Sequence, residues 1–223
     1  MADKAPIHPN PFWLTQRNYD RLSRWYDLLA GRGERKAQEI GLELLGAKEG
    51  DSVLEIGFGT GRALLDLALS VGKSGKVWGV EISPGMLSQT RRKIGLYGLS
   101  DRVVLLLGNA VHLPLRSDSY DALFMSFTIE LFSDEDCIHM LSECRRVLKG
   151  DGVLGVVALV NQPNPGLMSR MYQWAHGKLP NLIDCRPIDA QRLLSQAGFI
   201  VGEVSEMALW GLPVLIILAG KAV

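Results

Sequence analysis

Three glycines at alternate positions, Gly57, Gly59 and Gly61, follow a short apolar run at 53–56 and precede an amphipathic stretch. This pattern predicts a buried strand, a tight loop and the start of a helix. Glycine tolerates positive φ and lets a ligand approach the backbone closely, and the free N–H groups at a helix N-terminus bind carboxylates and phosphates. The loop is therefore a candidate ligand site, although a strand-to-helix turn that binds nothing would need similar glycines.

Glu81 stands twenty residues after Gly61, at the end of the next apolar run. A carboxylate there can accept hydrogen bonds from both hydroxyls of a ribose, worth about 1.5–3 kcal/mol. Nicotinamide enzymes share this feature, but their fingerprint has Gly or Ala where this chain has Arg62. No tyrosine is followed four positions later by lysine, so the catalytic pair of short-chain dehydrogenases is missing. A ribose-bearing ligand without a pyrophosphate fits better, and a nicotinamide oxidoreductase is the weaker alternative.

Predicted strands and helices alternate along the chain and would position these residues. Strand-like runs lie at 53–56, 76–81, 102–107, 122–126, 153–160, 199–205 and 213–219. Helix-like stretches lie at 18–29, 34–46, 62–69, 84–97, 135–148, 166–176 and 188–197, and Ser83 with Pro84 supplies a helix start. The alternation predicts an α/β fold with a three-layer, doubly wound, mostly parallel seven-stranded sheet. The connection at 210–212 is too short for a crossover helix, which predicts an antiparallel C-terminal hairpin strand.

The composition argues against several classes of protein. Apolar residues make up 47% and charged residues 22% of the 223, as in soluble globular domains. Lys plus Arg (24) equal Asp plus Glu (24), so no net field attracts nucleic acid. The N-terminal residues show no apolar secretion signal, the apolar stretch at 207–219 is too short to span a bilayer, and Cys137, Cys144 and Cys185 form no CxxC pair. We expect a cytoplasmic protein without a transmembrane segment, and the sequence leaves homo-oligomerisation open.

Four motifs occur in order: VLEIGFGTG, VWGVEISPGML, LLLGNAVHLPLRSDSYDALFMS and ECRRVLKGDGVLGVV. In this order and spacing the chain resembles the class I S-adenosylmethionine-dependent methyltransferases, which have a Rossmann-like fold, from about residue 13 onward. The stretches YDRLSRWYD and HLPLRSDSYD look most like the ubiquinone and menaquinone C-methyltransferases and some phospholipid N-methyltransferases. The resemblance implies one domain over 1–223, with a helical lid at 1–46, a cofactor-binding core at 47–160, an acceptor-side insertion at 161–187 and a C-terminal helix and hairpin at 188–223.

The resemblance also implies which residues bind S-adenosylmethionine. They are Glu55, Gly57, Gly59, Gly61, Glu81, Ile82, Asn109, Ala110 and Ser126. Glu55 and the glycine loop would hold the methionine end, Glu81 the ribose, and Ile82 one face of the adenine. Asn109, where Asp is commoner, would meet the adenine amino group, with the N–H of Ala110 toward the ring. Asn109 could instead form only an Asx turn, and Ser126 could pack without touching the methionine moiety.

Six candidate residues belong to the acceptor side. The catalytic candidates are Tyr19, Glu130 and His176, and the substrate-binding candidates are Tyr26, Tyr172 and Arg186. Tyr19 and Tyr26 lie seven apart on one helical face, where they could shield the methyl group or hold a cation, or simply pack a lid onto the core. Glu130 follows the fourth strand and could act as a base or neutralise an amine, or be an exposed loop charge.

The remaining acceptor-side candidates lie in the expected insertion. Tyr172 and His176 are four residues apart on a predicted helix, and His176 could accept a proton near neutral pH or be structural. Arg186 could grip an anionic acceptor or pair with Asp184.

The sequence thus predicts an S-adenosylmethionine-dependent methyl transfer by direct in-line displacement to a small or lipophilic metabolite, with release of S-adenosylhomocysteine. We expect no metal, because the four histidines are scattered. Cys137 and Cys144, seven apart on one helix, suit core packing better than arsenic methylation. An amine or phospholipid N-methyltransferase is the alternative within the class, and a non-catalytic S-adenosylmethionine-binding module is the alternative outside it.

Overall fold

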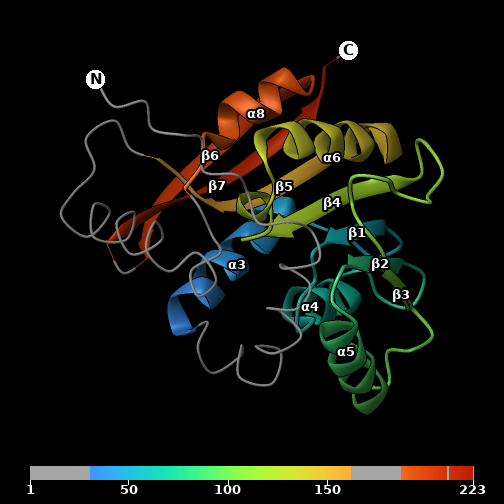
Figure 1. The fold of residues 1–223 in the computed structure, drawn as a ribbon. Coiled ribbons are helices and arrows are strands. Elements are labelled where there is room, and N and C mark those ends of the chain that lie inside the picture. The colour runs from blue at the N-terminus through green and yellow to red at the C-terminus, as the bar shows by residue number, and fades with distance from the viewer. Residues whose placement is uncertain (1–30, 162–186, 210, 223) are drawn as a thin grey trace, which may run out of the picture.

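The computed structural model describes residues 31–161, 187–209 and 211–222 (Figure 1). Seven strands form one sheet in the order β3-β2-β1-β4-β5-β7-β6. The strands are β1 (Ser52–Ile56), β2 (Lys76–Glu81), β3 (Val103–Leu107), β4 (Tyr120–Ser126), β5 (Leu148–Leu159), β6 (Phe199–Leu209) and β7 (Leu212–Lys221). The helices are α3 (Gly31–Leu45), α4 (Arg62–Ser70), α5 (Pro84–Leu96), α6 (Asp134–Val147), α8 (Ala190–Gln196) and the 3₁₀ turn η1 (Ile129–Leu131).

The pairing confirms the predicted sheet. The five strands β3, β2, β1, β4 and β5 pair in parallel, each with the next one in the sheet order. Strand β7 runs antiparallel to both β5 and β6. Leu209 pairs with Leu212 at the hairpin turn, where Gly211 has a φ of 79°. The apolar stretch at 207–219 therefore belongs to two sheet strands. Within the described residues, no helix is both long and apolar enough to cross a bilayer.

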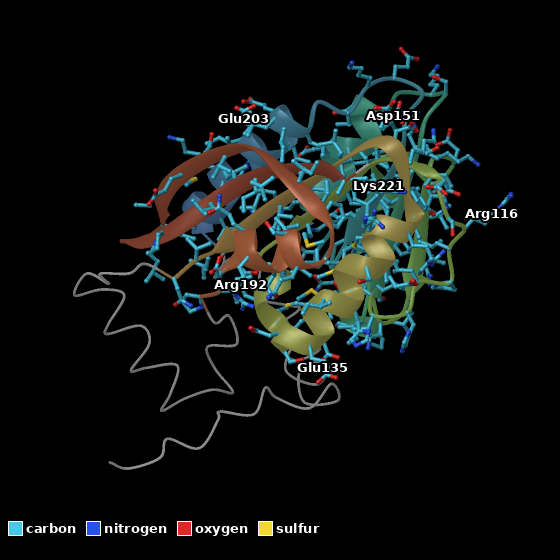
Figure 2. All side chains as sticks on the ribbon, turned by 90° about the horizontal axis from the view of Figure 1, so that it is seen from above. Arg116, Glu135, Asp151, Arg192, Glu203 and Lys221 are labelled. Carbon is cyan, nitrogen blue, oxygen red and sulfur yellow. The ribbon has the colours of Figure 1, made fainter. Side chains whose placement is uncertain are left out.

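Two helical layers sandwich the sheet (Figure 1). Helices α6 and α8 cover one face, with α3, α4 and α5 on the other, and each layer closes its own apolar core. Cys137 and Cys144 are fully buried in the α6 side of the core, as their spacing suggested, and burial raises the pKa of the Cys144 thiol to about 12. Arg192 of α8 (labelled in Figure 2) pairs with Asp134 at the start of α6 at 2.7 Å, which ties the two helices together.

The helix starts follow from local sequence. The Ser83 hydroxyl accepts the N–H of Met86 at 3.1 Å and Pro84 occupies the first turn, so α5 begins where it was predicted. Strand β5 begins earlier than predicted, at Leu148. Its pairing with β4 shifts register between Leu148 and Val153, so the Gly-rich residues between the predicted helix at 135–148 and the predicted strand at 153–160 form an irregularity inside the strand.

Candidate functional site

The glycine loop, residues 57–61, connects β1 to α4 at the carboxyl edge of the parallel strands. Gly57, Gly59 and Gly61 all have positive φ, at 69°, 51° and 78°. Residues with side chains rarely adopt this conformation, so each position favours glycine. Open α/β sheets bind ligands at this edge, which makes the loop the starting point for the site.

The three glycines are surrounded differently. A Cβ atom on Gly57 would lie 2.5 Å from Cγ2 of Thr128, and one on Gly61 would lie 2.4 Å from Cγ2 of Thr90. A Cβ atom on Gly59 would meet no atom of the described residues within 4 Å. The outer two glycines are therefore explained by close packing against threonines, whereas the middle one faces open space. A ligand that approaches the loop backbone has room at Gly59.

Two side chains of α5 hold two consecutive peptide groups in the second half of this loop. The Thr90 hydroxyl donates to the Gly59 carbonyl at 2.9 Å, and the Lys93 ammonium donates to the Thr60 carbonyl at 2.9 Å. Sequence reasoning did not identify either residue. The only available signal was a threonine and a lysine one turn apart on the helix that follows Glu81.

Glu81 ends β2 beside the loop and is 6% exposed. One carboxylate oxygen accepts the N–H of Gly59 at 2.9 Å. The other accepts the N–H groups of Ile82 and Ser83 at 2.9 and 2.8 Å. The predicted ribose acceptor is thus locked in place by backbone donors and lies next to the open position of the loop.

Glu55, on β1 just before the loop, is 1% exposed. Its Oε2 atom has no hydrogen-bond partner among the residues that the structure describes. Burial, and after it the negative charges of Glu81 and Asp66, raise the pKa of Glu55 well above its usual range. A buried carboxyl oxygen without a partner is costly, and a ligand that carries a positive charge would satisfy it. The residues present therefore fit a ligand with a ribose and a cationic group.

Asn109 and Ala110 follow β3 and lie next to Glu81, because the N–H of Gly108 donates to the Glu81 carbonyl at 2.9 Å. Asn109 forms an Asx turn, in which its Oδ1 accepts the N–H of Val111 at 3.1 Å. An amide oxygen can accept a second hydrogen bond, so this turn is compatible with a contact to adenine. The adenine role of Asn109 and Ala110 stays a prediction.

Ser126 ends β4 at the same edge. Its hydroxyl oxygen accepts a hydrogen bond from Nε2 of Gln38 at 2.8 Å, which leaves the hydroxyl proton for another acceptor. Gln38 lies on α3 and was not identified from the sequence, since a single glutamine on an amphipathic helix carries no signal. The side chain of Gln38 thus joins α3 to the methionine end of the predicted site.

Glu130 lies in η1 after β4 and is 1% exposed, so it is not the exposed loop charge that the sequence left open. Its Oε1 accepts the N–H of Leu159, at the end of β5, at 2.6 Å. The carboxylate therefore joins the turn that follows β4 to the end of β5, and its catalytic role stays a prediction. The other acceptor-side candidates lie outside the described residues: Tyr19, Tyr26, Tyr172, His176 and Arg186.

Comparisons with known proteins agree with the geometry. Residues 53–152 match the family described as a methyltransferase domain. The chain is 33% identical over 168 residues to the demethylmenaquinone methyltransferase of Lactobacillus johnsonii, covering 74% of this chain and 66% of that protein. It is 28% identical over 199 residues to the ubiquinone/menaquinone biosynthesis C-methyltransferase UbiE of Teredinibacter turnerae, covering 88% and 78%. The chain spans about 54–66% of the length of the demethylmenaquinone methyltransferases that it matches.

Solved structures share the fold. An S-adenosylmethionine-dependent methyltransferase from Aquifex aeolicus has a TM-score of 0.65 at 23% identity, covering 88% of this chain and 97% of that one. The [4+2]-cyclase SpnF has a TM-score of 0.77 at 18% identity, covering 98% and 100%. Because one of these two is a cyclase, the shared fold does not by itself identify a reaction. The matched domain, the similar relatives and the glycine loop followed by Glu81 together show that the chain belongs to the class I S-adenosylmethionine-dependent methyltransferases, and its sequence resembles proteins of the ubiquinone/menaquinone branch.

Proposed function

We propose that this protein transfers a methyl group from S-adenosylmethionine to a carbon atom of a lipophilic, quinone-like acceptor and releases S-adenosylhomocysteine. Similar proteins named for demethylmenaquinone and for ubiquinone/menaquinone methylation support the class of acceptor. The observation that carries the donor assignment is the glycine loop, which is open at Gly59 and bordered by two buried carboxyl groups, Glu55 and Glu81.

The donor, when bound, supplies an activated methyl group on a sulfonium, which needs no covalent enzyme intermediate. The chain's own contribution is then binding, orientation and exclusion of water, and orientation alone can supply about 7–11 kcal/mol. Glu81 would accept hydrogen bonds from the ribose hydroxyls, and Glu55 would face the charged methionine end. Ser126, which Gln38 holds, would line the same end, and Asn109 would meet the adenine.

We propose that the transfer is an in-line displacement in which the acceptor carbon bonds to the methyl group as the methyl–sulfur bond breaks. The electron pair of that bond goes to sulfur, and the acceptor loses a proton. Glu130 is our candidate for the proton acceptor on this side, because its buried carboxylate lies where β4 and β5 end. His176 and Tyr19 are the further catalytic candidates, and Tyr26, Tyr172 and Arg186 would contact the acceptor.

Labelled donor tests this proposal. Purified protein is incubated with S-adenosylmethionine carrying a tritiated methyl group and a reduced demethylated naphthoquinone with an isoprenoid tail, and products are partitioned between organic solvent and water. We expect label in the organic phase, and much less of it with the Gly59→Ala variant when the donor concentration is below the wild-type Kd. A parallel incubation replaces the quinone with a metabolite extract. Label transferred only to aqueous amines of that extract would favour an amine methyltransferase. Tight donor binding without transfer to either acceptor source would favour a non-catalytic binding module.

Three further expectations from the sequence remain proposals. We infer a single domain with a lid at 1–46 and an acceptor-side insertion at 161–187. We also infer a cytoplasmic location, which the cysteine pattern supports, and an acceptor that is a small molecule and not a nucleic acid. Sedimentation of the purified chain at several concentrations would measure its oligomeric state.

A further inference from the structure

Thr90 is a fully buried polar residue on the face of α5 that packs against the sheet. The other buried residues of this face are apolar: Met86, Leu87 and Ile94. A buried hydroxyl that forms no hydrogen bond lowers the stability of the folded state. The Thr90 hydroxyl avoids this cost because it donates to the Gly59 carbonyl at 2.9 Å. The Thr90 methyl group fills the space that a side chain at Gly61 would need. Thr90 therefore contacts the loop at two of its glycines.

The hydrogen bond from Thr90 fixes the orientation of a whole peptide group. In a trans peptide the C=O and the following N–H point in opposite directions. Because the Gly59 carbonyl points toward α5, the N–H of Thr60 is directed away from α5. The carbonyl of Thr60 is in turn held by Lys93 at 2.9 Å. Two consecutive loop carbonyls are thus turned toward the helix.

The same loop residue is held from its other side by Glu81. The N–H of Gly59 donates to the Glu81 carboxylate at 2.9 Å, and its C=O accepts from Thr90. Both backbone polar groups of Gly59 are therefore fixed by side chains from β2 and α5, while no atom of the described residues lies within 4 Å of the place a Cβ would take. Rotation of this peptide would move the loop backbone at the position where the donor approaches and would disturb the proposed ribose acceptor.

We propose that Thr90 is a positioning residue of the donor site, whose hydroxyl sets the loop conformation that the S-adenosyl ligand meets. This inference rests on the proposed function, because it assumes that the loop binds that ligand. Thr90 does not contact the reacting atoms, so loss of its hydroxyl weakens donor binding and leaves the transfer step unchanged once the donor is saturating.

Three variants test the role of the hydroxyl in donor binding. Thr90→Val keeps the side-chain shape and removes the hydrogen bond, and we expect the donor Kd and KM to rise about 3- to 10-fold with an unchanged kcat. Thr90→Ser keeps the hydroxyl, so its donor Kd should stay within about twofold of wild type. Ile94→Val trims the same buried face one turn further from the loop, so it should lower the Tm without changing donor affinity. Titration calorimetry with S-adenosylmethionine and with S-adenosylhomocysteine measures binding independently of any acceptor.

The outcomes separate this inference from the proposed function. If the wild type binds neither S-adenosyl compound, the donor assignment fails, and this inference fails with it. If the wild type binds but Thr90→Val binds equally well, or Ile94→Val weakens binding as much, only the positioning role is overturned. A kcat that falls with an unchanged donor KM would also overturn it. If Thr90→Val does not fold, the comparison of Thr90→Ala with Thr90→Ser applies the same criterion.

Discussion

Replacement of Glu81 by glutamine tests the donor site most sharply, because it keeps the size of the side chain and removes its charge. In the structure the carboxylate accepts three backbone N–H groups, from Gly59, Ile82 and Ser83. The amide oxygen of glutamine can still accept from Ile82 and Ser83. Its NH₂ group then faces the N–H of Gly59, and two donors oppose each other. Alanine would be a poorer choice, since it would leave all three N–H groups without their acceptor.

The size of the effect follows from these contacts. One hydrogen bond to a charged acceptor is worth about 1.5–3 kcal/mol, and Glu81 is 6% exposed, so water does not replace it readily. If the hydrogen bond from a ribose hydroxyl to Glu81 loses a similar free energy, the donor Kd rises roughly 10- to 100-fold. Loss of the Gly59 contact destabilises the fold by a similar free energy, which for a domain of this size lowers Tm by about 3–12 °C.

Calorimetric titration with S-adenosylhomocysteine and thermal unfolding by circular dichroism measure the two effects on one preparation. Glu203→Gln is the matched control, because Glu203 is exposed on the edge strand β6 (labelled in Figure 2). This control should change neither Kd nor Tm. Wild-type donor affinity in Glu81→Gln would refute the ribose assignment, and an unchanged Tm would refute the argument that Glu81 holds the loop.

Three further predictions follow from single residues. Gly59→Ala should raise donor Kd at least about tenfold while costing only about 1–2 kcal/mol of stability from its left-handed backbone, and normal donor binding by this variant would contradict an open ligand position there. Glu130→Gln should lower the free energy of unfolding in urea by about 1–3 kcal/mol because it weakens the contact with Leu159, and a stability equal to wild type would show that this contact is unimportant. Burial raises the pKa of Glu34 to about 7, against the opposing charge of Arg62. The stability contribution of Glu34 should therefore be complete below about pH 4.5 and be lost as the pH rises through about 7. In urea unfolding, the free energy of unfolding should fall less steeply between pH 4.5 and 7 in Glu34→Gln than in the wild type, and equal slopes for both proteins would contradict this prediction.

Much of the fold was predictable because apolar runs and glycines dictate it locally. The α/β alternation, the hairpin at Gly211 and the capped start of α5 at Ser83 were predicted and are confirmed. The early start of β5 was not predictable, since Gly150 and Gly152 are typical of a turn. Only their pairing beside β4 makes them part of a strand irregularity.

The site was predictable at the backbone level and less so for side chains that hold it. Glycine spacing and a carboxylate at a strand end are local signals, and they led to Gly59 and Glu81. The hydrogen bonds from Thr90 to Gly59 and from Gln38 to Ser126 join residues 31 and 88 positions apart in the chain. Such contacts depend on how the helices pack, which a single sequence does not contain.

The place of β7 between β5 and β6 has a consequence for the order in which the sheet is completed. Strand β6 precedes β7 along the chain, yet among the described strands it pairs only with β7, so during synthesis it lacks this partner until β7 has followed it. Until then the edge of β5 is an open row of backbone donors and acceptors, of the kind that recruits strands from other molecules. The pairing of β7 with β5 joins strands that are far apart in the sequence, and such long-range pairing is intrinsically slow. Substitutions in β7 should therefore reduce the yield of folded protein through aggregation of nascent chains, even where they are far from the donor site.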